Sequence, residues 1–242
     1  MLDAAIKALS QIFSPAFRAI LLKSIGLALV LLVIGGIAVH RGLIWLAEIG
    51  ESWAEGALGP TAHTSLAILD WILSVAAGLG LIIGSVFLMP AVTALVGSFF
   101  VDDIALEVER IHYPGEPVGS PLPFTRAMLE GAKTALLALA IYLLALPSLL
   151  IAGAGLVIFF VASAYILGRE YFELAAMRYH PVRLAKKLRK HNQGTVFVAG
   201  LLIAAFVSIP IVNLATPLFA MALMVHIHKR AMATAGPPAL GW

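Results

Sequence analysis

The chain contains four long stretches without a charged side chain, and these stretches constrain its fold more than any other feature. They cover residues 24–40, 71–101, 134–168 and 191–228, and hold 17, 31, 35 and 38 residues. A helix of about 20 apolar residues spans the hydrocarbon core of a bilayer. Charged residues make up 12% of the 242 residues, against roughly 25% in soluble domains. The sequence therefore predicts an all-α integral membrane protein with a single domain, residues 1–242.

Prolines divide the third and fourth stretches near their middle. Pro147 and Pro210 each lack a backbone donor and clash with the preceding turn, so a helix should end at each of them. Most of the resulting arms are shorter than the roughly 20 residues that a crossing requires. Each stretch is therefore too long for one span and too short for two comfortable ones.

Lysine and arginine are unevenly divided among the segments that flank the four stretches. From the N-terminus, the five flanking segments carry three, one, three, seven and two of them. If every stretch crossed once, the segment with seven cations would lie outside, against the tendency of basic loops to stay cytoplasmic. If the third and fourth stretches each enter and return, only the segment with Arg41 lies outside.

We therefore predict two transmembrane helices, over residues 15–46 and 66–98, and two re-entrant helical hairpins, over 132–168 and 193–229. Both termini are then cytoplasmic. Two tilted short spans in place of each hairpin, six crossings in all, give the same sidedness and remain an alternative. A hairpin tip at membrane depth must be buried in protein or face water, and we expect Ser208 and Asn213 to satisfy backbone groups at the second tip.

Two charged segments are predicted to form amphipathic helices at the membrane interface. Residues 182–191, VRLAKKLRKH, carry five cations, which favour anionic lipid by about 1 kcal/mol each near the surface or form a positive mouth that concentrates anions. In VDDIALEVERIH, the side chains of Asp103, Glu107 and Arg110 share one helix face because their spacings are four and three. This polar stripe is either a solvated surface or the lining of a passage.

The segment SPAFR, residues 14–18, has the pattern of a helix start. Ser14 is a favourable N-cap and Pro15 suits the first helical position. The N–H groups of Ala16, Phe17 and Arg18 would then be free at the positive end of the helix dipole, which favours anions. The Arg18 guanidinium adds donors matched to a tetrahedral oxyanion. An ordinary capped helix with Arg18 on a lipid phosphate is the alternative.

Three segments resemble the CysZ-type sulfate permease family of bacterial inner membranes, in the order and spacing of that family: SPAFRAILLKSIG, MPAVTALVGSFFVDDIALEVE and SIPIVNLATPLFAMAL. The resemblance covers nearly the whole chain. It implies two long spanning helices, two helical pairs that penetrate partway, an oligomer and a supply of sulfate for cysteine synthesis. It also implies Phe17 and Arg18 as the sulfate-binding pair. Ala16 and Ala19 replace a glycine and a second arginine of the family, as in a divergent member.

Motifs for catalysis and metal binding are missing from the sequence. It has no cysteine, which excludes thiolate metal sites and thiol nucleophiles, and it has no P-loop or HExxH motif. His226 and His228 are two residues apart, so they face different sides of a helix. We therefore expect no enzyme activity, no catalytic residue, no cofactor, no bound metal and no nucleic-acid partner.

The main hypothesis is a multi-pass sulfate or oxyanion permease of the bacterial inner membrane. Its expected partners are the oxyanion, membrane lipids and further copies of the chain in a homo-oligomer. Phe17 and Arg18 would bind sulfate, and Asp103, Glu107 and Arg110 would line the anion pathway. The alternative is a non-transporting membrane protein that acts in assembly or in lipid interaction.

Overall fold

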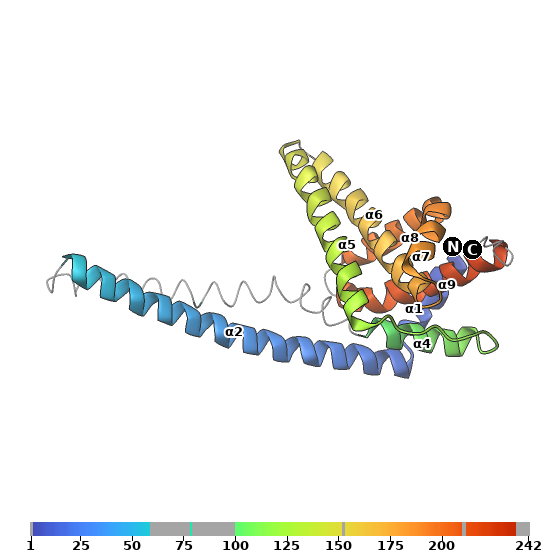
Figure 1. The fold of residues 1–242 in the computed structure, drawn as a ribbon, viewed down its shortest axis with the longest axis horizontal. Coiled ribbons are helices and arrows are strands. Elements are labelled where there is room, and N and C mark those ends of the chain that lie inside the picture. The colour runs from blue at the N-terminus through green and yellow to red at the C-terminus, as the bar shows by residue number, and fades with distance from the viewer. Residues whose placement is uncertain (1, 59–77, 79–99, 152, 210–211, 236–242) are drawn as a thin grey trace. The chain divides into compact units, whose positions relative to one another are not determined.

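The computed structural model describes residues 2–58, 78, 100–151, 153–209 and 212–235. Within these residues the chain forms α-helices and short 3-10 helices, and no strand (Figure 1). The predicted all-α membrane architecture is confirmed. The chain divides into two compact units: Met1–Leu22 with Gly97–Trp242 forms the first, and Lys23–Val96 forms the second.

The longest helix is α2, Pro15–Leu58. It begins where the sequence places the start of the first span and continues past the predicted end at residue 46. Its segment Pro15–Gly42 is long and apolar enough to cross a membrane, with a mean hydropathy of 2.5. Val33 and Ile37 on this segment are exposed, as lipid-facing side chains would be. The predicted span over 66–98 lies outside the described residues, apart from residue 78.

The third uncharged stretch forms a helical hairpin in the first unit. Helix α5 covers Phe124–Ala145, the 3-10 helix η2 covers Leu146–Leu150 and α6 covers Ala154–Met177. The predicted break at Pro147 is confirmed, because this residue lies at the start of η2 and not within a continuous helix. Gly153 precedes α6 with a φ of 76°, a left-handed conformation that glycine adopts without a Cβ penalty.

The two arms of this hairpin pack against each other (Figure 1). The hydroxyl oxygens of Tyr142 and Ser163 are 3.0 Å apart, and the ring of Tyr142 stacks on Phe159. The arms hold 22 and 24 residues, more than the uncharged stretch alone suggests, because charged turns extend each helix at its far end. Both arms are long and apolar enough to cross a membrane. The re-entrant arrangement stays a prediction.

The fourth stretch also breaks near its middle. The basic helix α7 covers Val182–His191, as predicted, and α8 covers Gln193–Val207. The short η3, Val212–Ala215, leads into α9, Thr216–Ala235. The chain thus leaves its helix before Pro210, in agreement with the rule that proline ends a helix.

Side chains at this second break make local hydrogen bonds. The Ser208 hydroxyl donates to the carbonyl oxygen of Ala204 at 2.8 Å, as expected of a residue that satisfies the backbone. The side chain of Asn213 instead accepts from the Thr216 hydroxyl at 3.0 Å. This bond ties Asn213 to the start of α9, and the expectation that its side chain also bonds the backbone stays a prediction.

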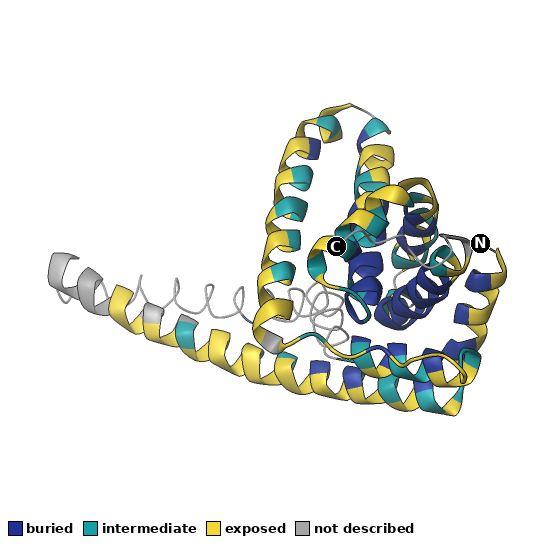
Figure 2. Ribbon diagram, turned by 45° about the vertical axis from the view of Figure 1, so that its right-hand side comes forward, coloured by how far each residue is buried: buried dark blue, intermediate teal, exposed yellow. Residues whose placement is uncertain are grey.

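The core of the first unit surrounds α9. Its large apolar side chains are buried, among them Leu218, Met221, Leu223 and Met224, and the helix packs against α1 (Leu2–Ile12), α4 (Val101–His112), α6 and α8. Figure 2 shows the buried residues gathered on these helices. Helix α9 is therefore the central core helix of the first unit, and the candidate membrane spans of the described residues lie on α2, α5 and α6.

Two glycines bring the backbones of α6 and α8 into contact. A Cβ on Gly200 would lie 2.0 Å from the carbonyl oxygen of Ala164 and 3.1 Å from the Cα of Gly168. A Cβ on Gly168 would lie 2.7 Å from the carbonyl oxygen of Val196. Small residues allow such close helix packing. This contact fixes the position of α6 against α8 near the residues that follow Gly168.

Candidate anion-binding site

The start of α2 has the predicted N-cap. The Ser14 hydroxyl oxygen accepts the Phe17 N–H at 3.3 Å, and the Ser14 carbonyl oxygen accepts the Arg18 N–H at 3.0 Å. The prediction that the N–H groups of Phe17 and Arg18 are free is therefore wrong. The physical reason is that a serine N-cap uses the same donors that an anion would need. The Ala16 N–H is the donor that this capping leaves over.

The side chains of Phe17 and Arg18 point to different environments. Phe17 is fully buried and belongs to the hydrophobic core of the first unit. Arg18 is exposed. The Phe17 ring therefore anchors the helix start in the core, while the Arg18 guanidinium lies on the surface of the protein. This arrangement can present a cation at a helix N-terminus, and it does not bring the Phe17 ring to the surface.

The polar stripe of α4 lies on the side of that helix away from the core. Asp103 and Arg110 are exposed and Glu107 is half-buried. Among the described residues, no ion pair joins Glu107 to Arg110. The structure thus keeps the three predicted residues together on one face of α4. Within the described part of the chain, no hydrogen bond or ion pair joins them to Arg18.

The opposite face of α4 carries an ion pair that the sequence analysis missed. Glu109 and Arg178 are both buried, and Arg178 Nε and Nη2 donate to the two carboxylate oxygens of Glu109 at 3.1 and 3.2 Å. Arg178 also donates to the Asp102 carboxylate and, at 3.0 Å, to the carbonyl oxygen of Gly119. A charged residue on the apolar face of an amphipathic helix is the signal in the sequence that indicates such a pair.

Gly119 completes this network from the loop that follows α4. Its N–H donates to Glu109 at 3.1 Å, and a Cβ at this position would lie 2.8 Å from the Cβ of Arg178. Burial alone would lower the pKa of Arg178, but the carboxylates of Glu109 and Asp102 outweigh burial and raise this pKa. The Arg178 guanidinium is therefore paired with carboxylates and a carbonyl oxygen of the protein itself. It holds α4, the loop and the end of α6 together and leaves no donor for an anion.

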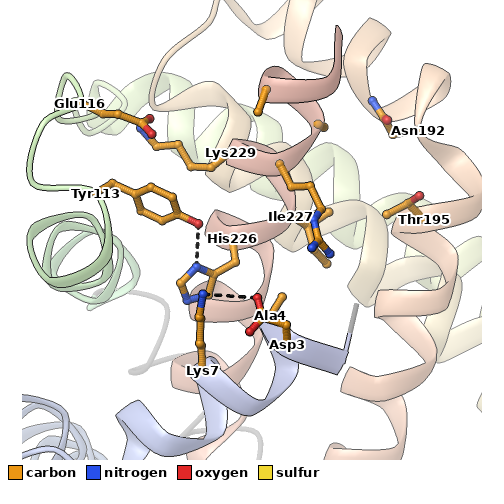
Figure 3. Close-up of a pocket in the computed structure, with 13 residues that line it drawn as sticks. Asp3, Ala4, Lys7, Tyr113, Glu116, Asn192, Thr195, His226, Ile227 and Lys229 are labelled. Atoms are coloured by element: carbon orange, nitrogen blue, oxygen red, sulfur yellow. Dashed lines mark hydrogen bonds and ion pairs between the residues drawn. The ribbon is translucent and has the colours of Figure 1, made fainter.

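A cavity of about 460 Å³ lies between α1, the loop after α4 and the last turns of α9 (Figure 3). Lys229 Nζ is 2.7 Å from the Glu116 carboxylate, and Lys7 Nζ is 3.3 Å from that of Asp3. Opposite charges thus alternate around this cavity. Both lysines of the lining are paired with carboxylates, and Arg230 adds a third cation to it.

Histidines lie on both sides of α9 beside this cavity. The Tyr113 hydroxyl and His226 Nδ1 are 2.8 Å apart, whereas the His228 ring stacks on Tyr179. The prediction that His226 and His228 face different sides of the helix is confirmed. Burial lowers the pKa of His112, which packs edge-on against His226, and burial also lowers the pKa of His180. Within the described residues, no group of three metal-binding side chains is close enough to hold a metal ion.

The chain was compared with known proteins and families. No curated protein matches it. The family described as "Sulfate transporter CysZ/Etoposide-induced protein 2.4" matches residues 4–217. The match runs from α1 to the start of α9 and includes Phe17, Arg18 and the whole of α4, so it covers most of the chain. The resemblance found in the sequence is therefore confirmed: the chain is a multi-pass α-helical membrane protein that belongs to the CysZ/Etoposide-induced protein 2.4 family.

Proposed function

We propose that the protein conducts sulfate, or a chemically similar oxyanion, across the bacterial inner membrane and so supplies sulfate for cysteine biosynthesis. Membership of a family whose description names a sulfate transporter supports this proposal. The observation that carries it is the exposed Arg18 at a capped helix start, in the part of the chain that the family covers.

The chemistry of this helix start suits a tetrahedral oxyanion. Arg18 offers a planar fork of N–H donors, which bonds two oxygens of one anion at once. The Ala16 N–H and the positive end of the α2 dipole favour negative charge at the same place. The buried ring of Phe17 limits the movement of the turn that carries Arg18. Phe17 and Arg18 then act as anchor and ligand.

The polar stripe of α4 is proposed as part of the anion pathway. Asp103 and Arg110 are exposed in the single chain, and a charged face at the membrane interface needs either water or a polar neighbour. In a homo-oligomer, the same face of another copy could supply that neighbour. We further propose re-entrant hairpins for the two proline-broken stretches and cytoplasmic termini, on the strength of the distribution of basic residues.

A role in lipid interaction without transport is the second candidate. The basic helix α7 favours it, because exposed cations such as Arg183 attract anionic lipid. The family description also names Etoposide-induced protein 2.4, so transport does not follow from the family match alone. Neither candidate is an enzyme.

Uptake of labelled sulfate into vesicles that contain only this protein tests the proposal. We expect faster uptake than in protein-free vesicles of the same lipid. Unlabelled sulfate in excess should compete, whereas chloride at equal ionic strength should compete far less. Uptake equal to that of protein-free vesicles, with the protein folded and inserted, would refute transport and favour the lipid-interacting role.

A further inference from the structure

Helices α6, α7 and α8 meet around a second cavity, of about 220 Å³. Its polar lining comes from all three helices: Tyr165 and Arg169 from α6, Arg189 and Lys190 from α7, and Gln193 from α8. This volume is several times the roughly 30 Å³ that one water occupies in the liquid. The cavity lies within the first unit and is separate from the start of α2 and from the larger cavity beside α9.

The charges around this cavity do not balance. Glu173 is the acidic partner of both arginines: its Oε1 is 3.2 Å from Arg169 Nε and 2.7 Å from Arg189 Nε. The side chains of Arg169, Arg189 and Glu173 are 18%, 12% and 5% exposed. Two mostly buried guanidinium groups thus share the Glu173 carboxylate, and Glu170 is a second carboxylate near Arg169. Lys190 adds a third cation to the lining, so three cations face two carboxylates. A mostly buried charge without a partner is costly unless a counter-ion binds beside it and neutralises it.

The arginines also have unused hydrogen-bond donors. Arg189 Nε is buried and forms its ion pair with Glu173 Oε1 at 2.7 Å. Arg169 reaches Glu173 through Nε. No hydrogen bond from the Nη atoms of either guanidinium is recorded among the described residues.

We propose that this cavity binds a tetrahedral oxyanion group of the phosphate or sulfate type. Guanidinium forks match the oxygens of such a group in pairs, and one negative charge would neutralise the surplus positive charge beside Glu173. Two sources carry this chemistry: the phosphate of an anionic lipid headgroup and a free inorganic anion. Helix α6 brings the cavity to the membrane, because the exposed Leu156 and Val157 lie on the same apolar helix.

The backbone contact of α6 and α8 holds the site in shape. Gly168 directly precedes Arg169, and its Cα approaches the backbone of Gly200 closely. Val196, whose carbonyl oxygen faces Gly168, also lines the cavity. The two helices therefore cannot separate at this level without losing their contact. A preformed site of this kind loses little flexibility when a ligand binds.

Lys190 and Lys187 provide a matched test. Both are exposed cations on α7, but Lys190 lines the cavity and Lys187 does not. Lys190→Gln and Lys187→Gln remove the same charge at positions where neither change threatens the fold. Arg189→Gln then removes a guanidinium from the site itself. All variants are made in the full chain with Arg18→Ala, so that binding at the start of α2 does not contribute.

Two measurements distinguish the sources of the group. Calorimetry of the delipidated protein in a neutral detergent, titrated with inorganic sulfate and then phosphate, detects a free anion. Native mass spectrometry after incubation with phosphatidylglycerol detects a retained lipid headgroup. In whichever measurement shows binding, Lys190→Gln should weaken it several-fold and Arg189→Gln by about 10- to 100-fold, as expected for a charge-assisted hydrogen bond of 1.5–3 kcal/mol. Lys187→Gln should leave it unchanged.

Glu173→Gln gives a result in the opposite direction. It removes the carboxylate that competes with the anion for both arginines, so binding should become tighter, which a purely structural role of this residue would not produce. Equal effects of Lys190→Gln and Lys187→Gln, or no binding of any of the three probes to the parent protein, would overturn the proposal. The readout is binding, so failure of sulfate transport in vesicles would not affect it.

Discussion

Glu109 and Arg178 are 69 positions apart in the sequence and form a forked ion pair in the interior of the first unit, with N–O distances of 3.1 and 3.2 Å. Both side chains are almost fully buried. Such a pair specifies which face of α4 packs against the end of α6, because each charge is costly without the other.

Removal of one partner should destabilise the fold strongly. Glu109→Gln leaves Arg178 buried with only Asp102 as a carboxylate partner, and losses of about 3–5 kcal/mol are typical when one partner of a buried pair is removed. Thermal unfolding of the purified protein in detergent measures the loss. Glu107→Gln, on the outward face of the same helix, is the control and should unfold near the wild-type temperature. Equal stability of the two variants would contradict the structural role of the pair.

The contact of α6 with α8 should not tolerate a side chain. Gly200→Ala places a Cβ 2.0 Å from the carbonyl oxygen of Ala164, so the helices must move apart and lose packing. We expect a lower folded yield in size-exclusion chromatography. Gly194→Ala, on the same helix with no neighbour within 4 Å of the new Cβ, should be neutral or slightly stabilising, because alanine favours a helix over glycine.

Arg18 should contribute directly to sulfate affinity. Arg18→Ala removes charge-assisted hydrogen bonds of roughly 1.5–3 kcal/mol each, so binding should weaken by about 10- to 100-fold. Arg18→Lys keeps the charge but loses the fork, and should give an intermediate loss. Sulfate titrations at two salt concentrations check this. If Lys187→Ala, which removes an exposed surface charge, weakened binding as much as Arg18→Ala does, the start of α2 would not be a specific site.

The topology can be tested with single cysteines, since the chain has none of its own. With cysteines at Ser52, Leu150, Lys187 and Ala233, an impermeant thiol reagent on intact cells should label only position 52. Leu150 is 90% exposed at the turn between α5 and α6. Labelling there from outside would show that both arms cross the membrane fully, and labelling of Lys187 would restore four single crossings.

Acid should destabilise the protein through His112 and His180. Burial lowers the pKa of each below its usual value of 6.5, so the folded state binds protons less readily than the unfolded state. The contribution of these groups to stability is therefore present above pH 6.5 and is lost as the pH falls below it. The unfolding temperature should drop between pH 7.5 and pH 5. A His112→Gln, His180→Gln double variant should show a smaller drop, and an unchanged drop would assign the effect to other groups.

Much of the architecture follows from local rules that the sequence displays. Pro147 ends a helix, Ser14 caps one, and the cations of α7 lie on a helix that begins where its sequence indicates. These features depend on a few neighbouring residues, so one sequence is enough to predict them. The free N–H groups of Phe17 and Arg18 were a wrong prediction because the serine cap and the anion compete for the same donors.

Other features depend on residues that meet only in the folded chain. Nothing near Glu109 indicates that its partner is Arg178, and nothing near Gly168 indicates Gly200. The same holds for the cavity between α6, α7 and α8, whose cations looked like one exposed basic helix. Sequence patterns show which face of a helix is apolar, but they do not show which distant helix covers that face.

The glycine contact has a mechanical consequence. Helix α6 is an arm of the first hairpin, yet Gly168 and Gly200 clamp it to α8, the first arm of the second hairpin. This contact couples the two hairpins, so neither can slide past the other at the level of Gly168 and Gly200. A motion that opens or closes a passage must bend the chain elsewhere, for example at Gly153, whose left-handed turn links α6 to the rest of its hairpin. Because the contact between Gly168 and Gly200 is rigid, the turn at Gly153 would act as the hinge of the first hairpin.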